Sequence, residues 1–281
     1  MRLTKRSTPA GDLGANGLPA LPPVRRQGLR SFMVDTLLLT RRHLLRTIRT
    51  PQLIVLAALM PVMFVLLFRY VFGGSIRVPG YAHYVDYLIP GIIVQTSLFG
   101  GSSSAVGIAD DIKKGVTDRF RSLPTNPGAI LAARTIADLV RLTYTVALII
   151  AVGLLVGYRF GNAWMPTAEG IAIALLFGYA CAWFFTLLGL VVRNVEGAQL
   201  AAFVVSFPLV FAASTFTATA TMPSGLRAFA DAQPVTNVAN AVRALSQGVG
   251  SAQRPALYAI AWSVGIILVS AAIAVRRFRT A

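Results

Sequence analysis

No charged side chain interrupts LIVLAALMPVMFVLLF, residues Leu53–Phe68, or LTYTVALIIAVGLLVGY, residues Leu142–Tyr158. A helix of about 18 apolar residues is long enough to cross the roughly 30 Å of hydrocarbon in a bilayer. In lipid, the backbone polar groups of a segment must be satisfied within that segment, so each continuous apolar run is expected to be a helix. Charged residues make up 13% of the chain, whereas a soluble domain has about 25%. The sequence therefore predicts an all-α integral membrane protein.

Apolar runs recur along the chain and predict six transmembrane helices, over residues 53–71, 87–108, 136–156, 171–192, 200–216 and 256–275. We expect this six-span domain to occupy residues 51–281. Before it, residues 29–50 carry a leucine-rich arc and an arginine-rich arc, which is typical of an amphipathic helix lying in the membrane interface. Residues 1–28 are rich in proline and arginine and have few large apolar residues, so we expect a disordered basic cytoplasmic tail.

The positions of lysine and arginine predict the orientation of the chain. With the N-terminus in the cytoplasm, most basic residues fall in cytoplasmic segments, and only these fall outside: Arg69, Arg77, Arg159, Arg227, Arg243 and Arg254. This bias predicts that both termini are cytoplasmic, which requires an even number of spans. The net charge of +16 is explained by this topology, and no nucleic-acid partner is expected.

The first cytoplasmic loop contains DDIKKGVTDRFRSLP, residues Asp110–Pro124. Read as a helix that ends at its proline, this segment has one apolar stripe, formed by Ile112, Val116, Phe120 and Leu123. Gly115 in its middle costs about 1 kcal/mol relative to alanine, and helix propensity offers no reason for it. Two interpretations remain open: an amphipathic loop that lies on the membrane surface, or a helix that docks a cytoplasmic partner.

This loop resembles that of the permease subunits of type-2 ABC exporters, and it is most similar to the daunorubicin-resistance permease group. The resemblance rests on an acidic pair, a glycine, a further aspartate and Leu123-Pro124 after a Gly/Ser-rich second span, and it extends over nearly the whole chain after Thr50. It implies a cytoplasmic coupling helix that contacts an ABC ATPase subunit through Asp110, Asp111, Gly115, Asp118, Phe120 and Pro124. Many members have Glu where Asp118 stands, a departure that keeps the charge.

The resemblance also implies an assembly in the bacterial inner membrane: two permease copies surrounded by membrane lipid, with two ATPase subunits. A homodimer is favoured over a heterodimer. ATP and Mg would bind to the partner, because none of the few lysines here ends a Gly-rich turn of the P-loop type. We therefore expect neither enzymatic activity nor a cofactor on this chain. His43 and His83 lie far apart and Cys181 is the only cysteine, so no metal site is expected.

Residues inside the spans suggest a substrate pathway. Gln95 is an uncharged hydrogen-bonding group at mid-membrane, where such groups usually face protein or water. Large apolar side chains of the first and fifth spans either line a cavity for a hydrophobic substrate or face the core or the lipid: Met60, Met63, Phe64, Phe207 and Phe211. In the second span, Gly100 with Ser104 and Gly101 with Ala105 are small residues four apart, which favours close helix packing over a direct part in the pathway.

The external segment over residues 219–255 is too long for a turn. Thr236 is expected to cap a short helix that has Val238, Val242 and Leu245 on one face and ends at Gly248. This helix either rests on the lipid headgroups or, as the resemblance suggests, partly re-enters the membrane from outside and closes the pathway.

The chain is thus expected to be the membrane permease subunit of an ATP-driven ABC exporter of a hydrophobic or amphipathic substrate: a drug, a lipid or a glycoconjugate. The alternative is an ion-coupled secondary transporter without an ATPase partner. That class usually places carboxylates inside the membrane, whereas the predicted spans put no Asp or Glu at mid-span. Asp138 and Arg141 lie three residues apart in the first turn of the third span and are expected to form a structural ion pair.

Overall fold

The computed structural model of the 281-residue chain describes residues 29–48, 51–76, 78–115 and 127–280. Within these ranges every regular element is a helix and no strand occurs, so the predicted all-α fold is confirmed. In chain order the elements are α1 (Leu29–Ile48), α2 (Pro51–Leu67), the π-helical η1 (Phe68–Phe72), α3 (Tyr84–Lys113), α5 (Pro127–Leu155), α6 (Trp164–Val192), α7 (Val195–Phe211), the 3-10 helix η2 (Thr219–Thr221), α8 (Ser224–Ala232), α9 (Pro234–Gln247) and α10 (Gln253–Thr280).

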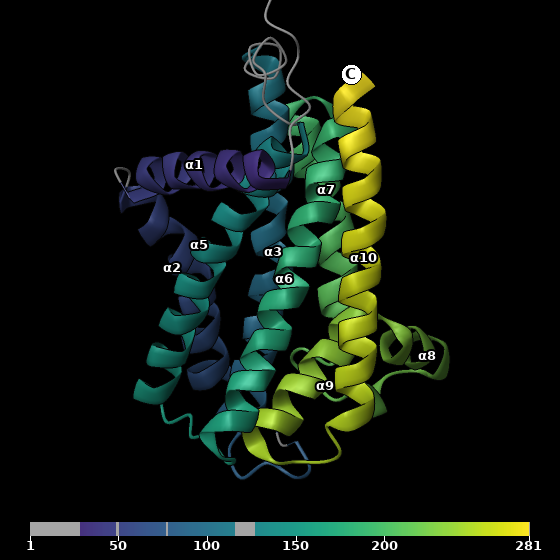
Figure 1. The fold of residues 1–281 in the computed structure, drawn as a ribbon. Helices are drawn as coiled ribbons and strands as arrows, with labels where there is room; N and C mark the ends of the chain where they lie inside the picture. Colours follow the sequence, from purple (N-terminus) through teal and green to yellow (C-terminus); the bar gives the residue numbers. More distant parts are fainter. Residues whose placement is uncertain (1–28, 49–50, 77, 116–126, 281) are drawn as a thin grey trace, which may run out of the picture.

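Long apolar helices run side by side and form the bundle (Figure 1). Among the described residues, four helices are long and apolar enough to cross a membrane, over Tyr84–Lys113, Gly128–Leu155, Trp164–Val192 and Gln253–Phe278. Two shorter apolar helices, Ala58–Phe72 and Val195–Phe211, accompany them. The outer faces of the bundle expose large apolar side chains, among them Leu200, Leu257 and Leu268. Such a surface is suited to lipid or to another protein, and the chain is a multi-pass membrane protein.

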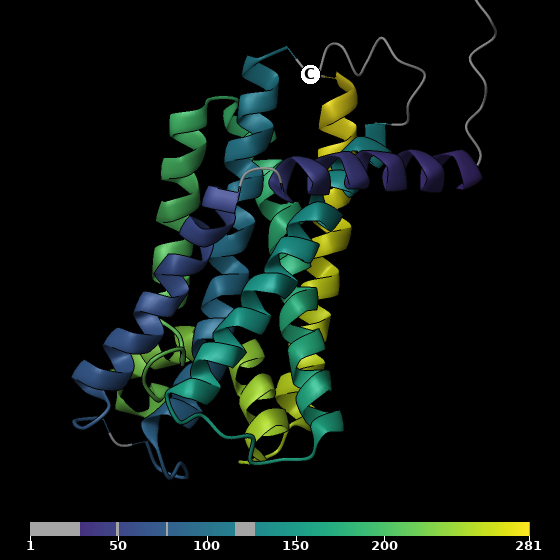
Figure 2. The same ribbon diagram turned by 90° about the vertical axis from the view of Figure 1, so that its left-hand side faces the viewer.

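α1 lies across one end of the bundle instead of along it (Figure 2). It is fixed to α5 through Thr40, whose buried hydroxyl donates hydrogen bonds to the Thr36 carbonyl at 2.7 Å and to the Ala133 carbonyl at 3.3 Å. Other positions of α1 expose large apolar side chains, including Leu37 and Leu38. A helix held across the bundle with exposed apolar residues has the properties that an interfacial helix needs.

α3 and α6 form the centre of the bundle. α3 is buried without interruption over its first half, from Tyr84 to Leu98. Further along, small residues let α6 approach closely: a Cβ on Gly101 would lie 2.9 Å from the Cys181 carbonyl carbon, and one on Gly189 would lie 2.4 Å from the Ala105 carbonyl oxygen. The packing role predicted for Gly101 and Ala105 is confirmed.

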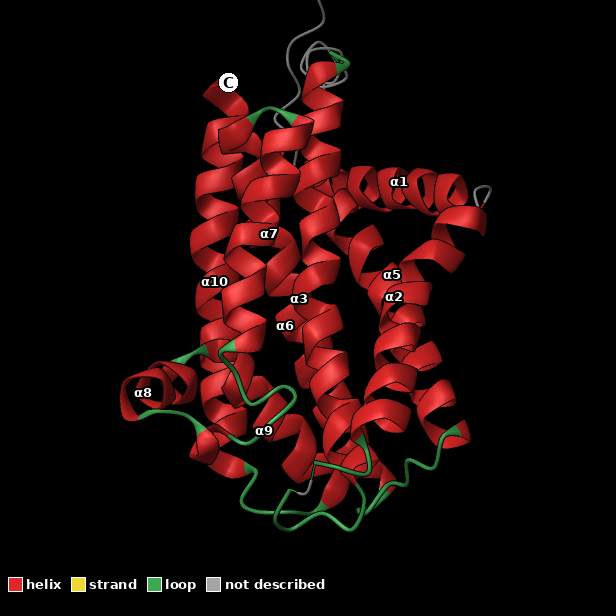
Figure 3. Cartoon of the chain, turned by 180° about the vertical axis from the view of Figure 1, so that it is seen from behind, coloured by secondary structure: helices red, strands yellow, loops and turns green. Residues whose placement is uncertain are grey.

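α8 and α9 form the end of the bundle opposite α1 (Figure 3). α9 packs against α3, α6 and α10, and most of its side chains are buried, so it is inserted into the bundle and does not rest on the surface. Gly248, with φ of 71°, ends α9 where the sequence predicted. The predicted cap is wrong, because the N-cap is Gln233, and the Thr236 hydroxyl accepts a hydrogen bond from the Ser214 N–H at 3.1 Å.

Most helices extend beyond the predicted spans, and three of the differing boundaries have a structural reason. α5 begins at Pro127 and not near residue 136. Its charged residues have partners within the bundle, so they do not indicate a segment that lies outside it. α3 continues past residue 108 to Lys113. α7 ends at Phe211 and not at residue 216, because the following residues form turns that neighbouring helices hold by hydrogen bonds.

The helix predicted over Asp110–Pro124 is not continuous, since Asp110 and Asp111 belong to the last turn of α3. Gly115 follows with φ of 64°, and its N–H donates to the Ile112 carbonyl at 3.0 Å. Glycine adopts this left-handed conformation without steric cost, so the residue ends α3, which explains the glycine that helix propensity could not. Asp118, Phe120 and Pro124 lie outside the described residues.

Candidate functional site: a cavity between α2, α3, α5 and α7

A cavity of about 470 Å³ lies between four helices of the bundle. Ligand sites typically have volumes of roughly 300–1,000 Å³. Each helix presents residues three or four positions apart, as one helix face does. The lining residues are Met60, Pro61 and Phe64 of α2, Gln95, Thr96, Phe99, Gly100 and Ser103 of α3, Asp138, Arg141, Leu142 and Thr145 of α5, and Phe203, Phe207 and Phe211 of α7.

The structure brings together five of the six residues predicted for a substrate pathway: Met60, Phe64, Gln95, Phe207 and Phe211. Met63 does not line the cavity, and its side chain is 52% exposed. Gly100, predicted to have a packing role, lies at the cavity wall. Sequence reasoning missed Phe99 and Phe203, although each lies four residues from a predicted member on the same helix.

Aromatic rings form one wall of the cavity. Along α7 the ring centroids of Phe203 and Phe207 are 5.3 Å apart, and those of Phe207 and Phe211 are 4.3 Å apart. The row continues through Phe216, at 5.5 Å from Phe211, to Phe68 at 4.6 Å. A spacing of 4.5–7 Å is usual for aromatic pairs, so the rings form a nearly continuous apolar surface from the cavity toward the α9 end.

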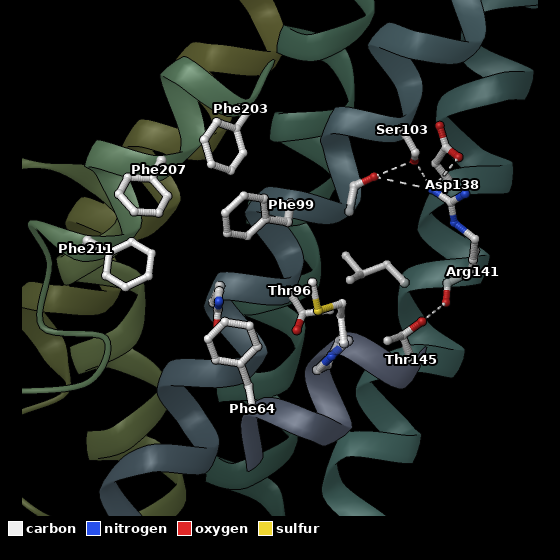
Figure 4. A pocket seen from close by; sticks show the side chains of 15 residues that line it. Phe64, Thr96, Phe99, Ser103, Asp138, Arg141, Thr145, Phe203, Phe207 and Phe211 are labelled. Atoms are coloured by element: carbon white, nitrogen blue, oxygen red, sulfur yellow. Dashed lines mark hydrogen bonds and ion pairs between the residues drawn. The ribbon is translucent and has the colours of Figure 1, made fainter. Parts of the chain in front are cut away.

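The opposite wall carries an ion pair. Figure 4 shows Asp138, Arg141 and Thr145 of α5 facing the α7 rings across the cavity, with Phe64 and Phe99 between them. Arg141 Nη2 lies 3.1 Å from Asp138 Oδ1, and it donates hydrogen bonds to the Gly100 carbonyl at 3.3 Å and to the Ser103 hydroxyl. The Ser104 hydroxyl donates to Asp138 Oδ2 at 2.5 Å. These contacts join α5 to α3.

The predicted pairing of Asp138 with Arg141 is confirmed, and the helix that carries the pair begins earlier than predicted. α5 begins at Pro127, so Asp138 lies about three turns into the helix. The carboxylate therefore lies within an apolar helix, at the wall of the cavity. The four lining residues of α5 have the i, i+3, i+4, i+7 spacing of one helix face, and this was the signal in the sequence that connected the pair with a cavity.

Gln95 is the second polar position of the cavity. It lies two turns before Ser103 on α3 and is 6% exposed. Its Oε1 accepts no hydrogen bond from any residue that the structure describes. A buried amide without a partner costs free energy, so this position is suited to a ligand that supplies one.

A second charged cluster lies where α1, α3 and α5 meet. The Arg134 guanidinium of α5 forms an ion pair with Asp111 at the end of α3. It passes over Gly107, where a Cβ would collide with the guanidinium. Burial lowers the pKa of His43 on α1, and Arg134 lowers it further, so this imidazole is neutral at pH 7. Of the residues predicted for coupling, Asp111 is thus fixed to α5, while Asp110 pairs with Lys114 at 2.6 Å in an exposed position.

The α9 end of the bundle holds a buried cation that sequence reasoning did not single out. Arg243 is 2% exposed, and its guanidinium lies 3.5 Å from the centroid of the Tyr87 ring. It donates to the Tyr87 carbonyl at 3.0 Å, to the Thr215 carbonyl at 2.9 Å and to the Ser214 hydroxyl at 3.1 Å. Tyr84 and Tyr87 donate their hydroxyls to the carbonyls of Phe216 and Ser214. The turn after α7 is thereby fixed to α3 and α9.

In the described part of the chain, no group of His, Cys, Asp and Glu side chains is arranged to hold a metal ion. The site consists of an aromatic wall, an ion pair and a single amide in the middle of apolar helices. These features are suited to binding an amphipathic molecule.

Comparison with known proteins identifies the family. Residues 35–246 match the family described as ABC-2 type transporter, and the chain belongs to that family. It is 30% identical over 252 residues to the daunorubicin resistance ABC transporter permease protein DrrB1 of Streptomyces coeruleorubidus, a match that covers 88% of this chain and 86% of the relative. It is 25% identical over 268 residues to the probable doxorubicin resistance ABC transporter permease protein DrrC of Mycobacterium tuberculosis, covering 93% of this chain and 95% of the relative. The resemblance predicted from the loop is confirmed, and the ABC permease interpretation is favoured over an ion-coupled transporter.

Proposed function

We propose that this chain is the membrane subunit of an ATP-driven exporter that carries a hydrophobic or amphipathic molecule out of the cell, while a separate ABC ATPase binds ATP and Mg. The observation that carries the proposal is the cavity itself. In a chain of the ABC-2 type transporter family, an aromatic wall faces an ion pair among apolar helices. Two relatives are named for resistance to daunorubicin and doxorubicin, so a drug is one candidate beside a lipid or a glycoconjugate.

The proposed substrate pathway begins in the cavity and follows the row of phenylalanine rings toward the α9 end. Met60, Phe64, Gln95, Phe207 and Phe211 would contact the substrate, and the pathway would include Phe99, Phe203 and Arg141 as well. The position of α9, packed against the ends of α3, α6 and α10, supports a role in closing the outer end.

In the proposed topology the chain crosses the bacterial inner membrane six times, by α2 with η1, α3, α5, α6, α7 and α10. Both termini would then be cytoplasmic, with α1 in the inner interface and α9 partly re-entrant from outside. The placement of α1 and α9 at opposite ends of the bundle supports this orientation. A reporter fused after Ala281 should be cytoplasmic, and an external signal there would remove the six-span topology.

We assign contact with the ATPase to the loop after α3, with Asp110, Asp111, Gly115, Asp118, Phe120 and Pro124 as the coupling residues. The ion pair between Asp111 and Arg134 supports this assignment, because it ties the start of the loop to α5, which lines the cavity. A movement of the loop would reach the cavity wall through this contact. The proposed assembly contains a second permease copy, and a homodimer accounts for it with one gene product.

The test is purification of the tagged chain from its own membrane. We expect an ABC ATPase to copurify, and we expect Asp118→Arg to abolish copurification while the permease remains inserted. The matched control is Asp231→Arg, the same substitution at an exposed position of α8, which should leave the complex intact. A chain that purifies alone under gentle conditions, or a complex that survives Asp118→Arg, would contradict the proposed coupling.

A further inference from the structure

The ion pair of the cavity has unused hydrogen-bond donors. Arg141 makes its contacts with Asp138, Gly100 and Ser103 through Nη2 alone. Its Nε and Nη1 donate to no group within the described ranges, and its side chain is 31% exposed at the cavity wall. A guanidinium has five N–H donors and no acceptor. The unused groups of Arg141 at this end of the cavity can therefore bind only a hydrogen-bond acceptor of a ligand.

Asp138, by contrast, has both oxygens engaged. Oδ1 faces Arg141 and Oδ2 accepts from Ser104 at 2.5 Å. Its side chain is 18% exposed, against 31% for Arg141. Each oxygen of Asp138 thus has one contact already and the carboxylate is the less exposed member of the pair, whereas an anionic ligand can add to the unused N–H donors of Arg141 without removing an existing contact. The more accessible and less satisfied member of the pair is the cation, which favours a ligand that carries negative charge.

At the other end of the cavity, Gln95 offers a neutral amide. The distance along α3 from Gln95 to Ser103, the neighbour of Arg141, is two turns, or roughly 12 Å. Its Oε1 has no partner among the residues described, and the side chain is more than nine-tenths buried. A hydroxyl or amide group of a ligand, which can donate and accept, would satisfy it.

Between these two polar positions the walls are apolar. Phe99 lies one turn from Gln95 on α3, and Phe64 and Phe207 line the cavity from α2 and α7. A ligand that reaches from Gln95 to Arg141 must therefore have an apolar body with a polar group at each end.

We infer that the cavity binds an anionic amphiphile whose acidic group contacts Arg141 and whose far end carries a neutral hydrogen-bonding group that contacts Gln95. This inference rests on the proposed function, since it names the class of the transported molecule. The acidic amphiphile comes either from the surrounding bilayer or from the cytoplasm, and both sources share the same chemistry at Arg141.

The experiment measures binding to the permease in phosphatidylcholine nanodiscs, without ATP or the ATPase. The probe is radiolabelled ω-hydroxydecanoate, and nanodiscs without protein give the background from partition into lipid. We expect the probe to bind saturably. Decanoate should displace only part of the bound probe, and ω-hydroxydecylamine should displace none. These competitors are compared on the unaltered protein, so this arm does not depend on the folding of a variant. A cationic competitor as effective as the anionic one would overturn the inference.

Three variants assign the ends of the ligand. Arg141→Gln should weaken binding of the probe by about tenfold or more, because it removes charge-assisted hydrogen bonds to the carboxylate. Arg141→Lys, which keeps the charge, should retain most of the affinity. Gln95→Leu should weaken ω-hydroxydecanoate to the affinity of decanoate and leave decanoate itself unchanged. Equal loss for both probes would show that Gln95 does not contact the hydroxyl, and would overturn that half of the inference.

Replacing phosphatidylcholine by phosphatidylglycerol separates the two sources. If phosphatidylglycerol competes with the probe and this competition depends on Arg141, an anionic bilayer lipid occupies the site. If the affinity for the probe is unchanged, the site is assigned to a soluble amphiphile. Loss of ATP-dependent export with intact binding would contradict the proposed function alone, whereas export without any Arg141-dependent binding would contradict only this inference.

Discussion

Two arginines inside the bundle have opposite relations to their surroundings. Arg243, at the α9 end, is buried without a carboxylate partner among the described residues, and carbonyls, a hydroxyl and the Tyr87 ring surround its guanidinium. Arg141 has a carboxylate partner but retains free donors at a cavity wall. A cation whose surroundings are complete holds elements together, whereas a cation with free donors can bind something else. The comparison separates the structural end of the molecule from the binding end.

The largest expected effect comes from replacing Arg243, the arginine whose guanidinium is fully surrounded by partners. Arg243→Leu leaves the Thr215 carbonyl and the Ser214 hydroxyl without their donor and removes the contact with Tyr87, so we expect a loss of about 2–4 kcal/mol of stability. Thermal unfolding in detergent, followed by size-exclusion chromatography, measures it. Arg254→Leu removes an exposed arginine of α10 and is the control. Equal stability of the two variants would show that Arg243 does not fix the outer end.

The next effect sharpens the contrast, because it should appear in transport and not in stability. Arg141→Gln is expected to reduce ATP-dependent export into inverted vesicles by roughly tenfold. Its unfolding should change by only about 1 kcal/mol, since the pair that it breaks is partly exposed. Arg141→Lys should keep most of the export, whereas Arg243→Lys should not recover stability, because lysine has neither the planar fork nor the stacking of arginine. If Arg141→Gln unfolded in detergent and left export unchanged, Arg141 would be a structural residue and the assignment of the two ends would be wrong.

A charge exchange tests whether the loop after α3 communicates with the cavity. Asp111→Arg and Arg134→Asp should each reduce substrate-stimulated ATP hydrolysis by the partner, and the double exchange should restore part of it. The expected coupling energy is about 1–2 kcal/mol for two groups in direct contact. If the losses of ATP hydrolysis were additive, with no recovery in the double variant, the ion pair would only hold α3 against α5.

A smaller effect is expected at the aromatic wall. Phe207→Ala removes a ring between Phe203 and Phe211 and should lower the export rate severalfold, because it opens a gap in the apolar surface. Met63→Ala is the matched control, since Met63 lies on α2 outside the cavity. Initial rates of export at several substrate concentrations distinguish weaker binding from slower turnover, and similar losses in both variants would argue against a pathway along α7.

The smallest effect concerns pH. Burial and Arg134 lower the pKa of His43, so the folded protein binds this proton less readily than the unfolded chain does. The contribution of His43 to stability is therefore complete above its ordinary pKa of about 6.5 and declines as the pH falls below that value. Thermal unfolding of the protein and of His43→Gln between neutral and mildly acidic pH measures the difference, and parallel curves would exclude the contribution.

The sequence predicted the helices better than their ends. Apolar composition is a local property, so each predicted span corresponds to a helix of the structure. The ends depended on side chains whose charge suggested solvent: Arg134 was assigned to the chain before the predicted start at 136, yet it is paired within the bundle. Gly115 and Gly248 were visible as glycines, but only Gly248 was interpreted as a helix end, because Gly115 lay within an apparent amphipathic stripe.

The candidate site was predictable in part. Met60, Phe64, Gln95, Phe207 and Phe211 were selected because bulky or polar residues within spans are candidates for a pathway, and the structure places them at one cavity. Arg141 was interpreted as one member of a structural pair, since the sequence does not show that Ser103 and Gly100 lie beside it while two of its nitrogens remain free. The partners of Arg243 include backbone carbonyls, which have no signature in the sequence.

The sequence by itself determined that the chain is helical, that it lies in a membrane and that its cytoplasmic loop resembles that of ABC permeases, because hydrophobicity and motif spacing are written in consecutive residues. Only the tertiary structure decided which faces of α2, α3, α5 and α7 meet at a cavity, and which of the two arginines inside the bundle keeps unused hydrogen-bond donors. Hydrogen bonds between helices join residues far apart in the chain, from Gly100 with Arg141 to Tyr87 with Arg243. Their geometry arises only when the helices pack.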